Sequence, residues 1–325
     1  MYSGYITDIE GIKVGHSTSE EGMTGCTVVI CEEGATGGVD VRGSAPGTRE
    51  TDLFRPEKTV DRVHAIVLSG GSAFGLDASS GVMKYLEEQG IGFDVGVTKV
   101  PIVASAVIFD LNIGDYRIRP DLVMGYEAAK SATTRENRQG NIGCGMGATV
   151  GKIMGPKNVM KSGLGSATIE VGELKVSALV SVNSFGDIYD YRTNEQIAGV
   201  YDYSRDIMLN TYEIMKNRDS DIGFSIQNTT IGIIATNAIL NKAQAYKISQ
   251  MAHNGFARSI DPIHTMVDGD TIFTMATNKI EADINLVGSM AAEVMSQAIS
   301  NAIFYSKGYN EIYSFQDIIQ SKVLD

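Results

Sequence analysis

A threonine stands at the start of an apolar, β-branched segment. Thr229 follows Asn228 and leads through Thr230 into Ile231–Asn237. In an intact chain this threonine is an ordinary strand residue. If the Asn228–Thr229 bond is cut, Thr229 gains a free α-amine beside its own hydroxyl, so that one residue holds both a nucleophile and a base. An α-amino group has a pKa of about 7.7–8.0, which suits proton transfer near neutral pH.

Other polar residues have types that could assist such a nucleophile. Lys152 follows a glycine-rich stretch, and Asn183 follows an apolar strand-like segment. Asp268 and Asp270 flank Gly269 just before another apolar strand-like segment. An asparagine amide can stabilise an oxyanion, and a pair of carboxylates can hold an amine and a hydroxyl in place. The alternatives are a solvated lysine, a turn asparagine and an Asx-type turn.

Two glycine-rich stretches resemble known motifs but do not satisfy them. Ser69–Gly75 lacks the G-x-S-x-G spacing because Phe74 stands where the second glycine is required. It predicts a glycine turn that feeds a helix, with Ser72 near the cap or in the wall of a substrate pocket. Gly143–Lys152 is not a phosphate-binding loop, because Ile153 follows the lysine in place of Ser or Thr.

The composition is that of a globular protein, with 43% hydrophobic and 20% charged residues among 325. A net charge of −12 disfavours nucleic-acid binding. Cys26, Cys31 and Cys144 form no even framework, which favours a reducing, cytoplasmic compartment. We expect no signal peptide, no membrane span, no metal site and no organic cofactor, since the start lacks an apolar h-region, no 18-residue apolar run exists and the four histidines have no ligand spacing.

The hydrophobic pattern predicts strands and helices along the whole chain. Predicted strands are Ile12–Gly15, Thr27–Cys31, Gly38–Val41, Val63–Ser69, Ser105–Leu111, Ser166–Glu170, Lys175–Val182, Ile231–Asn237 and Thr271–Ala276. Predicted helices are Phe74–Gln89, Leu122–Ser131, Tyr201–Lys216, Lys242–Arg258 and Glu281–Tyr305. Polar Asn217–Gln227 is a predicted surface linker. Without strict βαβ alternation, the pattern favours one α+β domain over residues 1–325, with layered mixed sheets and helices outside.

Taken together, ordered segments along nearly the whole chain resemble the DmpA-type aminopeptidases, a family that includes β-aminopeptidases and nylon-oligomer hydrolases. These segments are Gly11–His16, Gly43–Glu50, Ser69–Leu76, Gly143–Lys152, Val182–Gly186, Asn228–Asn237 and Pro262–Thr271. The resemblance implies a layered αββα sandwich of the N-terminal-nucleophile-hydrolase type. It also implies self-cleavage between Asn228 and Thr229 into chains 1–228 and 229–325, which stay together and assemble as a homotetramer of cleaved heterodimers.

The resemblance also implies roles for individual residues. Thr229 is the implied nucleophile, surrounded by Lys152, Asn183, Asp268 and Asp270, with the asparagine as the oxyanion donor or the group that orients the nucleophile. The better-studied aminopeptidases have a serine nucleophile and a Ser-x-Glu arrangement. The threonine and the two aspartates of this chain are therefore closer to the nylon-oligomer type.

One further departure concerns the substrate pocket. Phe109 stands where the nylon-oligomer type has a tyrosine, so a phenolic donor is missing. We place Ser72, Phe109 and Cys144 in the predicted pocket. The expected function is hydrolysis of small peptides, amino-acid amides or ω-amino-acid oligoamides such as 6-aminohexanoate oligomers. The alternatives are an acyltransferase resembling ornithine acetyltransferases and an uncleaved, non-catalytic relative used for binding.

Overall fold

Alternating apolar side chains give the central strands two buried faces. The computed structural model of the protein describes residues 1–217 and 228–324, so the predicted linker lies outside it from residue 218 onward. In strand β16 (Ile231–Ala238), Ile231 and Ile233 join one buried cluster and Ile234 joins another. Successive side chains of a strand point to opposite faces, so a strand with this pattern must be covered on both sides.

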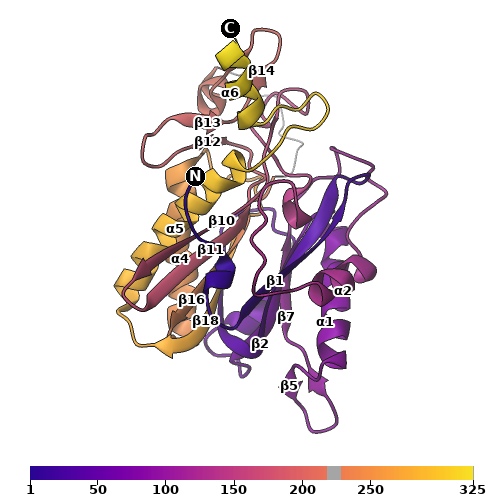
Figure 1. The fold of residues 1–325 in the computed structure, drawn as a ribbon, viewed down its shortest axis with the longest axis vertical. Helices are drawn as coiled ribbons and strands as arrows, with labels where there is room; N and C mark the ends of the chain where they lie inside the picture. Colours follow the sequence, from indigo (N-terminus) through magenta and orange to yellow (C-terminus); the bar gives the residue numbers. More distant parts are fainter. Residues whose placement is uncertain (218–227, 325) are drawn as a thin grey trace.

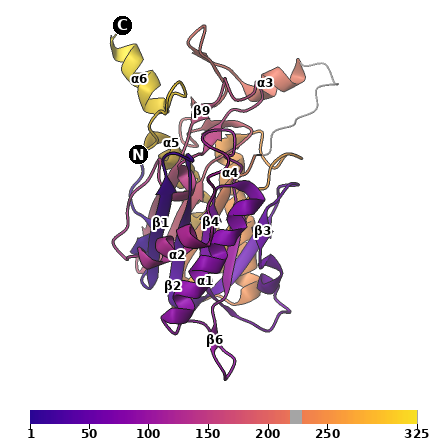
Figure 2. The ribbon, with the colours of Figure 1, turned by 90° about the vertical axis from the view of Figure 1, so that its right-hand side faces the viewer.

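The strands form two β layers that are enclosed by two helical layers (Figure 1). Helices α4 (Lys242–Ser259) and α5 (Ile284–Phe304) lie on one side, and α1 (Ala78–Glu88) and α2 (Leu122–Lys130) lie on the other. Figure 2 shows α1 and α2 in front of β1, β2 and β4. The paired strands run in the order β10 (Leu164–Val171), β11 (Leu174–Ser181), β16, β18 (Thr271–Ile280), β2 (Thr24–Val41), β4 (Arg62–Ser69), β7 (Val103–Val107) and β3 (Thr48–Arg49), with β1 (Ile12–Ser19) also on β2.

Strand β2 joins the two layers. The sequence pattern predicted separate strands at Thr27–Cys31 and Gly38–Val41, but both belong to this one long strand. Its first part pairs with β1 and β4, and its last part, from Thr36 to Val41, pairs with β18. The register against β4 shifts between Ile30 and Ala35, a local irregularity of the kind that lets a strand bend. The polar break in the hydrophobic pattern therefore marks a shift in the pairing of β2 with β4, and not the end of a strand.

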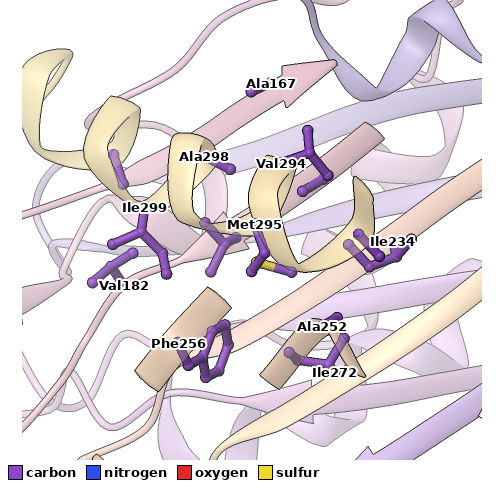
Figure 3. Packing of buried hydrophobic residues seen from close by; sticks show 14 of the residues in the cluster. Ala167, Val182, Ile234, Ala252, Phe256, Ile272, Val294, Met295, Ala298 and Ile299 are labelled. Carbon is purple, nitrogen blue, oxygen red and sulfur yellow. The ribbon is translucent and has the colours of Figure 1, made fainter. Parts of the chain in front are cut away.

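Three buried clusters fill the three spaces between the four layers. The first lies between α4, α5 and their sheet face, where Phe256, Met295 and Ile299 meet Ile234 and Ile272 (Figure 3). A second cluster lies between the two β layers and draws side chains from both of them. A third joins β2, β4 and β7 to α1 and α2. Close approach is part of this packing, because a Cβ on Gly165 of β10 would lie 2.0 Å from the Ala298 carbonyl oxygen of α5.

Short elements complete the described chain. The minor strands are β5 (Phe93–Asp94), β6 (Lys99–Val100), β8 (Thr149–Val150), β9 (Met160–Lys161), β12 (Asp187–Tyr189), β13 (Gln196–Ala198), β14 (Tyr201–Asp202), β15 (Ile207–Met208) and β17 (Ile260–Asp261). The short helices are η1 (Ile6–Asp8), η2 (Thr51–Phe54), η3 (Ser72–Asp77), η4 (Gly143–Gly145), α3 (Thr211–Lys216) and α6 (Phe315–Leu324). Within residues 1–217 and 228–324, no helix is long and apolar enough to cross a membrane.

The predicted helix Tyr201–Lys216 is wrong over most of its length. Only its last part is helical, as α3, and the rest forms the hairpin of β14 and β15. The Asp202 carboxylate accepts hydrogen bonds from the backbone N–H groups of Ser204 at 3.0 Å and Arg205 at 3.3 Å. Asp206 then adopts a positive φ of 55°. Aspartate favours such turns, and this local chemistry overrides the helical spacing.

Candidate active site

Thr229 lies where β16 begins, beside the start of β18. The two strands pair in parallel from Ile231 and Thr271 onward, and Asn228 bridges to Asp268 just ahead of them. The Asn228 N–H donates to the Val267 carbonyl oxygen at 2.9 Å. Thr229 is only 5% exposed. The parallel pairing therefore holds the Asn228–Thr229 bond against the Asp268–Asp270 turn.

The hydroxyl of Thr229 points back to the carbonyl group of Asn228. It donates a short hydrogen bond to that carbonyl oxygen, which also accepts the Gly269 N–H at 2.8 Å. A main-chain donor on the oxygen of a carbonyl group stabilises the negative charge that nucleophilic attack would create there. A Cβ on Gly269 would lie 2.9 Å from the Thr229 Oγ1, so a glycine lets the turn approach the hydroxyl this closely.

The nitrogen of Thr229 faces Asn183 and Lys152. The Thr229 N–H donates to the Asn183 carbonyl oxygen at 3.0 Å. Lys152 Nζ donates to the same oxygen at 3.1 Å and to Asn183 Oδ1 at 2.6 Å. Burial lowers the pKa of Lys152 to about 7, although the carboxylates of Asp268 and Asp110 oppose this shift. The lysine can therefore exchange a proton near neutral pH beside the Asn228–Thr229 peptide bond.

The side-chain amide of Asn183 is held at both ends. Its Oδ1 accepts the Thr149 N–H at 3.1 Å in addition to Lys152, and its Nδ2 donates to the Phe109 carbonyl oxygen at 3.0 Å. The amide donor of Asn183 therefore contacts Phe109, while the Asn228 carbonyl oxygen accepts from the Gly269 N–H and the Thr229 hydroxyl. Sequence reasoning missed Gly269 because a main-chain donor has no side-chain signature; its place between two aspartates was the available signal.

The two aspartates belong to the turn beside Thr229. Asp268 Oδ2 accepts the N–H and the hydroxyl of Thr265 at 2.8 and 2.6 Å. Burial, and then repulsion from Asp270, raise the pKa of Asp268 to about 6. Asp270 Oδ1 accepts the Thr230 N–H at 2.8 Å, and its Oδ2 lies 2.8 Å from His264 Nδ1. The hydrogen bonds of these carboxylates thus go to Thr230, His264 and Thr265, whereas the sequence predicts that they hold the hydroxyl and amine of Thr229.

The predicted pocket residues fall in two places. Ser72 and Phe109 are half-buried, and the N–H of Ser72 donates to the Ile108 carbonyl at 2.9 Å, so both adjoin the segment that holds Asn183. Cys144 is fully buried in the cluster between the β layers, where burial raises the pKa of its thiol. The side chain of Cys144 therefore packs in the core, and its assignment to the pocket stays a prediction.

Comparison with known proteins places nearly the whole chain in one family. The model of peptidase family S58 matches residues 4–312. The chain belongs to this family. It is 40% identical over 297 residues to an uncharacterized aminopeptidase of Mycobacterium leprae, a match that covers 85% of this chain and 79% of the relative. It is 31% identical over 311 residues to the 6-aminohexanoate-oligomer endohydrolase of Kocuria, with 91% and 84% covered.

Solved structures of low sequence identity share the fold. The L-aminopeptidase D-Ala-esterase/amidase of Ochrobactrum anthropi, described as a variant of the Ntn-hydrolase fold, matches with a TM-score of 0.73 at 15% identity, covering 98% of this chain and 93% of that chain. The Burkholderia β-aminopeptidase matches with a TM-score of 0.69 at 19% identity, with 99% and 95% covered. The predicted family and the layered α+β fold are confirmed. As a member of peptidase family S58, the protein is an amide-bond hydrolase.

In the described residues, no group of three or more His, Cys, Asp or Glu side chains is arranged to hold a metal ion. The polar groups around Thr229 that the structure describes are the lysine, the asparagine, the two aspartates and the main-chain N–H of Gly269. Together with the Thr229 hydroxyl, these groups include the residue types that nucleophilic attack on an amide requires, namely a hydroxyl, a proton carrier and a donor for the oxyanion.

Proposed function

We propose that the protein cuts its own Asn228–Thr229 bond and then uses the new N-terminal Thr229 to hydrolyse small amides. The observation that carries this proposal is the arrangement of the Thr229 hydroxyl and the Gly269 N–H around the Asn228 carbonyl group. The Thr229 hydroxyl lies against its carbonyl, and the Gly269 N–H binds the carbonyl oxygen at 2.8 Å. A nucleophile and an oxyanion donor are thus arranged on one peptide bond of the chain itself.

The proposed self-cleavage has two steps. The Thr229 Oγ1 attacks the carbonyl carbon of Asn228 while its proton passes to the Thr229 nitrogen, with Lys152 available as the carrier. The C–N bond then breaks, leaving a free amine and an ester between Asn228 and the threonine oxygen. Water hydrolyses this ester, which gives a carboxylate on Asn228 and restores the hydroxyl. Two chains, 1–228 and 229–325, result.

In turnover, the same hydroxyl attacks a substrate amide. The free amine of Thr229 takes the hydroxyl proton and delivers it to the leaving amine, which forms an acyl-enzyme. Water then releases the acid and regenerates the hydroxyl. We assign the Asn183 amide and the Gly269 N–H to the oxyanion. Asp268 and Asp270 keep the turn and Thr230 in place, and thereby hold the nucleophile in position.

The proposed substrates are small peptides, amino-acid amides and ω-amino-acid oligoamides such as 6-aminohexanoate oligomers. Two relatives support this range, because one is named an aminopeptidase and the other a 6-aminohexanoate-oligomer endohydrolase. Assays of the mature protein on amino-acid amides and on 6-aminohexanoate trimer would rank these classes. Adding ornithine or glutamate tests for acyl transfer to an amine acceptor. If transfer occurs, an N-acylated acceptor replaces the free acid among the products.

The proposal is tested by the intact mass of the purified protein after incubation near neutral pH. We expect two chains, the smaller of which begins at Thr229. Thr229→Ala removes the hydroxyl and should remain one chain without amidase activity, whereas Thr229→Ser keeps a hydroxyl and should still be cut. Cleavage of Thr229→Ala at the same bond, or full amidase activity in that variant, would contradict the proposal.

A further inference from the structure

A second lysine is buried close to the site without contacting Thr229. Lys161 in β9 is 0% exposed. Its Nζ donates to the carbonyl oxygens of Gly145 at 3.3 Å and Ala148 at 3.0 Å, and also to that of Ser162. No carboxylate of the described chain lies within ion-pair distance of this ammonium group. Its charge is therefore balanced by three peptide dipoles, two of which belong to the glycine-rich segment Gly143–Lys152.

One of these peptide groups leads directly to Asn183. The Ala148 carbonyl that Lys161 binds and the Thr149 N–H belong to the same peptide bond. That N–H donates to Asn183 Oδ1 at 3.1 Å, and Asn183 Nδ2 donates to Phe109 at 3.0 Å. Each hydrogen bond in such a chain polarises the next one, which strengthens the final donor. A cation at one end therefore acts on the amide N–H at the other.

We propose that Lys161 is a positioning residue for hydrolysis. Its ammonium group fixes and polarises the Ala148–Thr149 peptide, and thereby orients Asn183 and strengthens its amide as a donor to the substrate oxyanion. This inference rests on the proposed function, in which Thr229 is the nucleophile and Asn183 serves the oxyanion. Burial lowers the pKa of Lys161 to about 7, and the Asp110 carboxylate opposes this shift, so a charged fraction persists at neutral pH.

The chain offers a matched control for a purely structural role. Lys242 in α4 is 7% exposed, and its Nζ also donates to three carbonyl oxygens, those of Leu53 at 3.0 Å, Lys58 at 2.9 Å and Val60 at 3.0 Å. None of these carbonyls belongs to a peptide that contacts Asn183. Lys242→Met therefore measures the cost of removing a buried lysine that holds carbonyl groups but does not reach the site.

The test compares Lys161→Met, Lys161→Gln and Lys242→Met by kcat, KM and the rate of self-cleavage. For Lys161→Met we expect kcat to fall about tenfold at nearly constant KM, because the lost interaction acts on the oxyanion. Lys161→Gln keeps a donor without the charge, so it should fall between Lys161→Met and wild type. Self-cleavage should slow by less than about threefold, because the observed donor on Asn228 is Gly269. Lys242→Met should leave all three quantities within about twofold of wild type.

A second comparison shows whether Lys161 acts through Asn183. In an Asn183→Ala background, Lys161→Met should cause no further fall in kcat, since coupled residues are not additive. A full tenfold fall in that background would overturn the proposal, as would equal losses in Lys161→Met and Lys242→Met. Failure of both Lys161 variants to fold would assign this lysine a structural role and also overturn it. Amidase activity in Thr229→Ala would instead refute the proposed function, so the two failures can be distinguished.

Discussion

At the scale of single residues, Asp268 is a buried carboxyl group in the turn beside Thr229. Burial and the neighbouring Asp270 raise the pKa of this carboxyl to about 6, while the hydroxyl and N–H of Thr265 act in the opposite direction. Repulsion between two close carboxylates favours a proton on one of them. Ionisation of Asp268 therefore falls within the pH range in which Lys152, with a pKa of about 7, also titrates.

Thr265→Val should move the acidic limb of the rate profile. The change removes the hydroxyl that donates to Asp268 Oδ2 at 2.6 Å and leaves the N–H in place. The lost hydrogen bond favoured the ionised carboxylate, so the pKa of Asp268 rises and the acidic limb of kcat/KM shifts to higher pH, by about one unit. A kcat/KM profile from about pH 5 to 8 measures this shift. Thr265→Ser serves as the control, and an unchanged limb in the valine variant would contradict the prediction.

The candidate site residues could be predicted only in part, because the sequence shows polar side chains but does not mark main-chain donors. Thr229, Lys152, Asn183 and the aspartates carry polar side chains at strand ends and beside glycines, so their types and positions are visible in the sequence. The Gly269 N–H is a main-chain donor with no such mark. The packing of Cys144 in the cluster between the β layers could not be predicted either, because the direction of a side chain depends on tertiary packing and not on distance along the chain.

At the scale of secondary structure, the close approach of α5 to the sheet depends on a glycine in β10. A Cβ on Gly165 of β10 would lie 2.0 Å from the Ala298 carbonyl oxygen and 2.4 Å from the Ala302 nitrogen, both in the main chain of α5. A helix cannot yield at one carbonyl without moving the residues packed around it. The position of α5 is thus set partly by this glycine.

Gly165→Ala should therefore destabilise the protein by about 1–3 kcal/mol, because overpacking forces the helix away from the sheet. Val171→Ala, at an exposed position of the same strand, should change the free energy of unfolding by less than about 0.5 kcal/mol. Urea denaturation measures both changes, with Thr229→Ala as the common background to keep one chain. Equal midpoints for the two variants would show that the helix adjusts without cost.

Elements with strong periodicity were predicted well from the sequence. The helices α4 and α5 follow the expected ranges Lys242–Arg258 and Glu281–Tyr305 closely, because each has a continuous buried stripe. Segment Tyr201–Lys216 was predicted wrongly because the turn at Asp202 overrides its spacing. The pairing of β16 with β18 could not be predicted at all, since parallel partners are chosen by tertiary contacts.

At the scale of the whole molecule, buried ionisable groups set an unusual pH dependence. Burial raises the pKa of Asp110, Asp187 and Asp268 to about 6, and lowers that of Lys152 and Lys161 to about 7. A carboxyl with a raised pKa binds more protons in the folded state, so its contribution to stability is lost as pH rises toward its folded pKa. The lysines have the opposite sign and add stability above about pH 7.

Asp187 allows this effect to be isolated. It accepts hydrogen bonds from the Thr211 N–H at 2.6 Å, the Thr211 hydroxyl at 2.7 Å and the Val200 N–H at 3.0 Å. Between about pH 4 and 6, the wild-type fold should lose about 1.4 kcal/mol per pH unit relative to Asp187→Asn, since asparagine does not titrate. Urea denaturation across this range measures the difference in the uncleaved background. Parallel stability curves for the two proteins would contradict the prediction.

The strand order has a consequence for the lifetime of the processed protein. Strands β16 and β18 lie side by side, with β11 on one flank and β2 on the other, and both flanking strands precede Asn228 in the chain. Once the proposed cut is made, the shorter chain supplies the central strands while the longer chain supplies both of their neighbours. Unfolding then releases two molecules in place of one, so refolding becomes a second-order reaction that slows on dilution. Heat or denaturant would thus inactivate the cut protein far less reversibly than its uncut precursor.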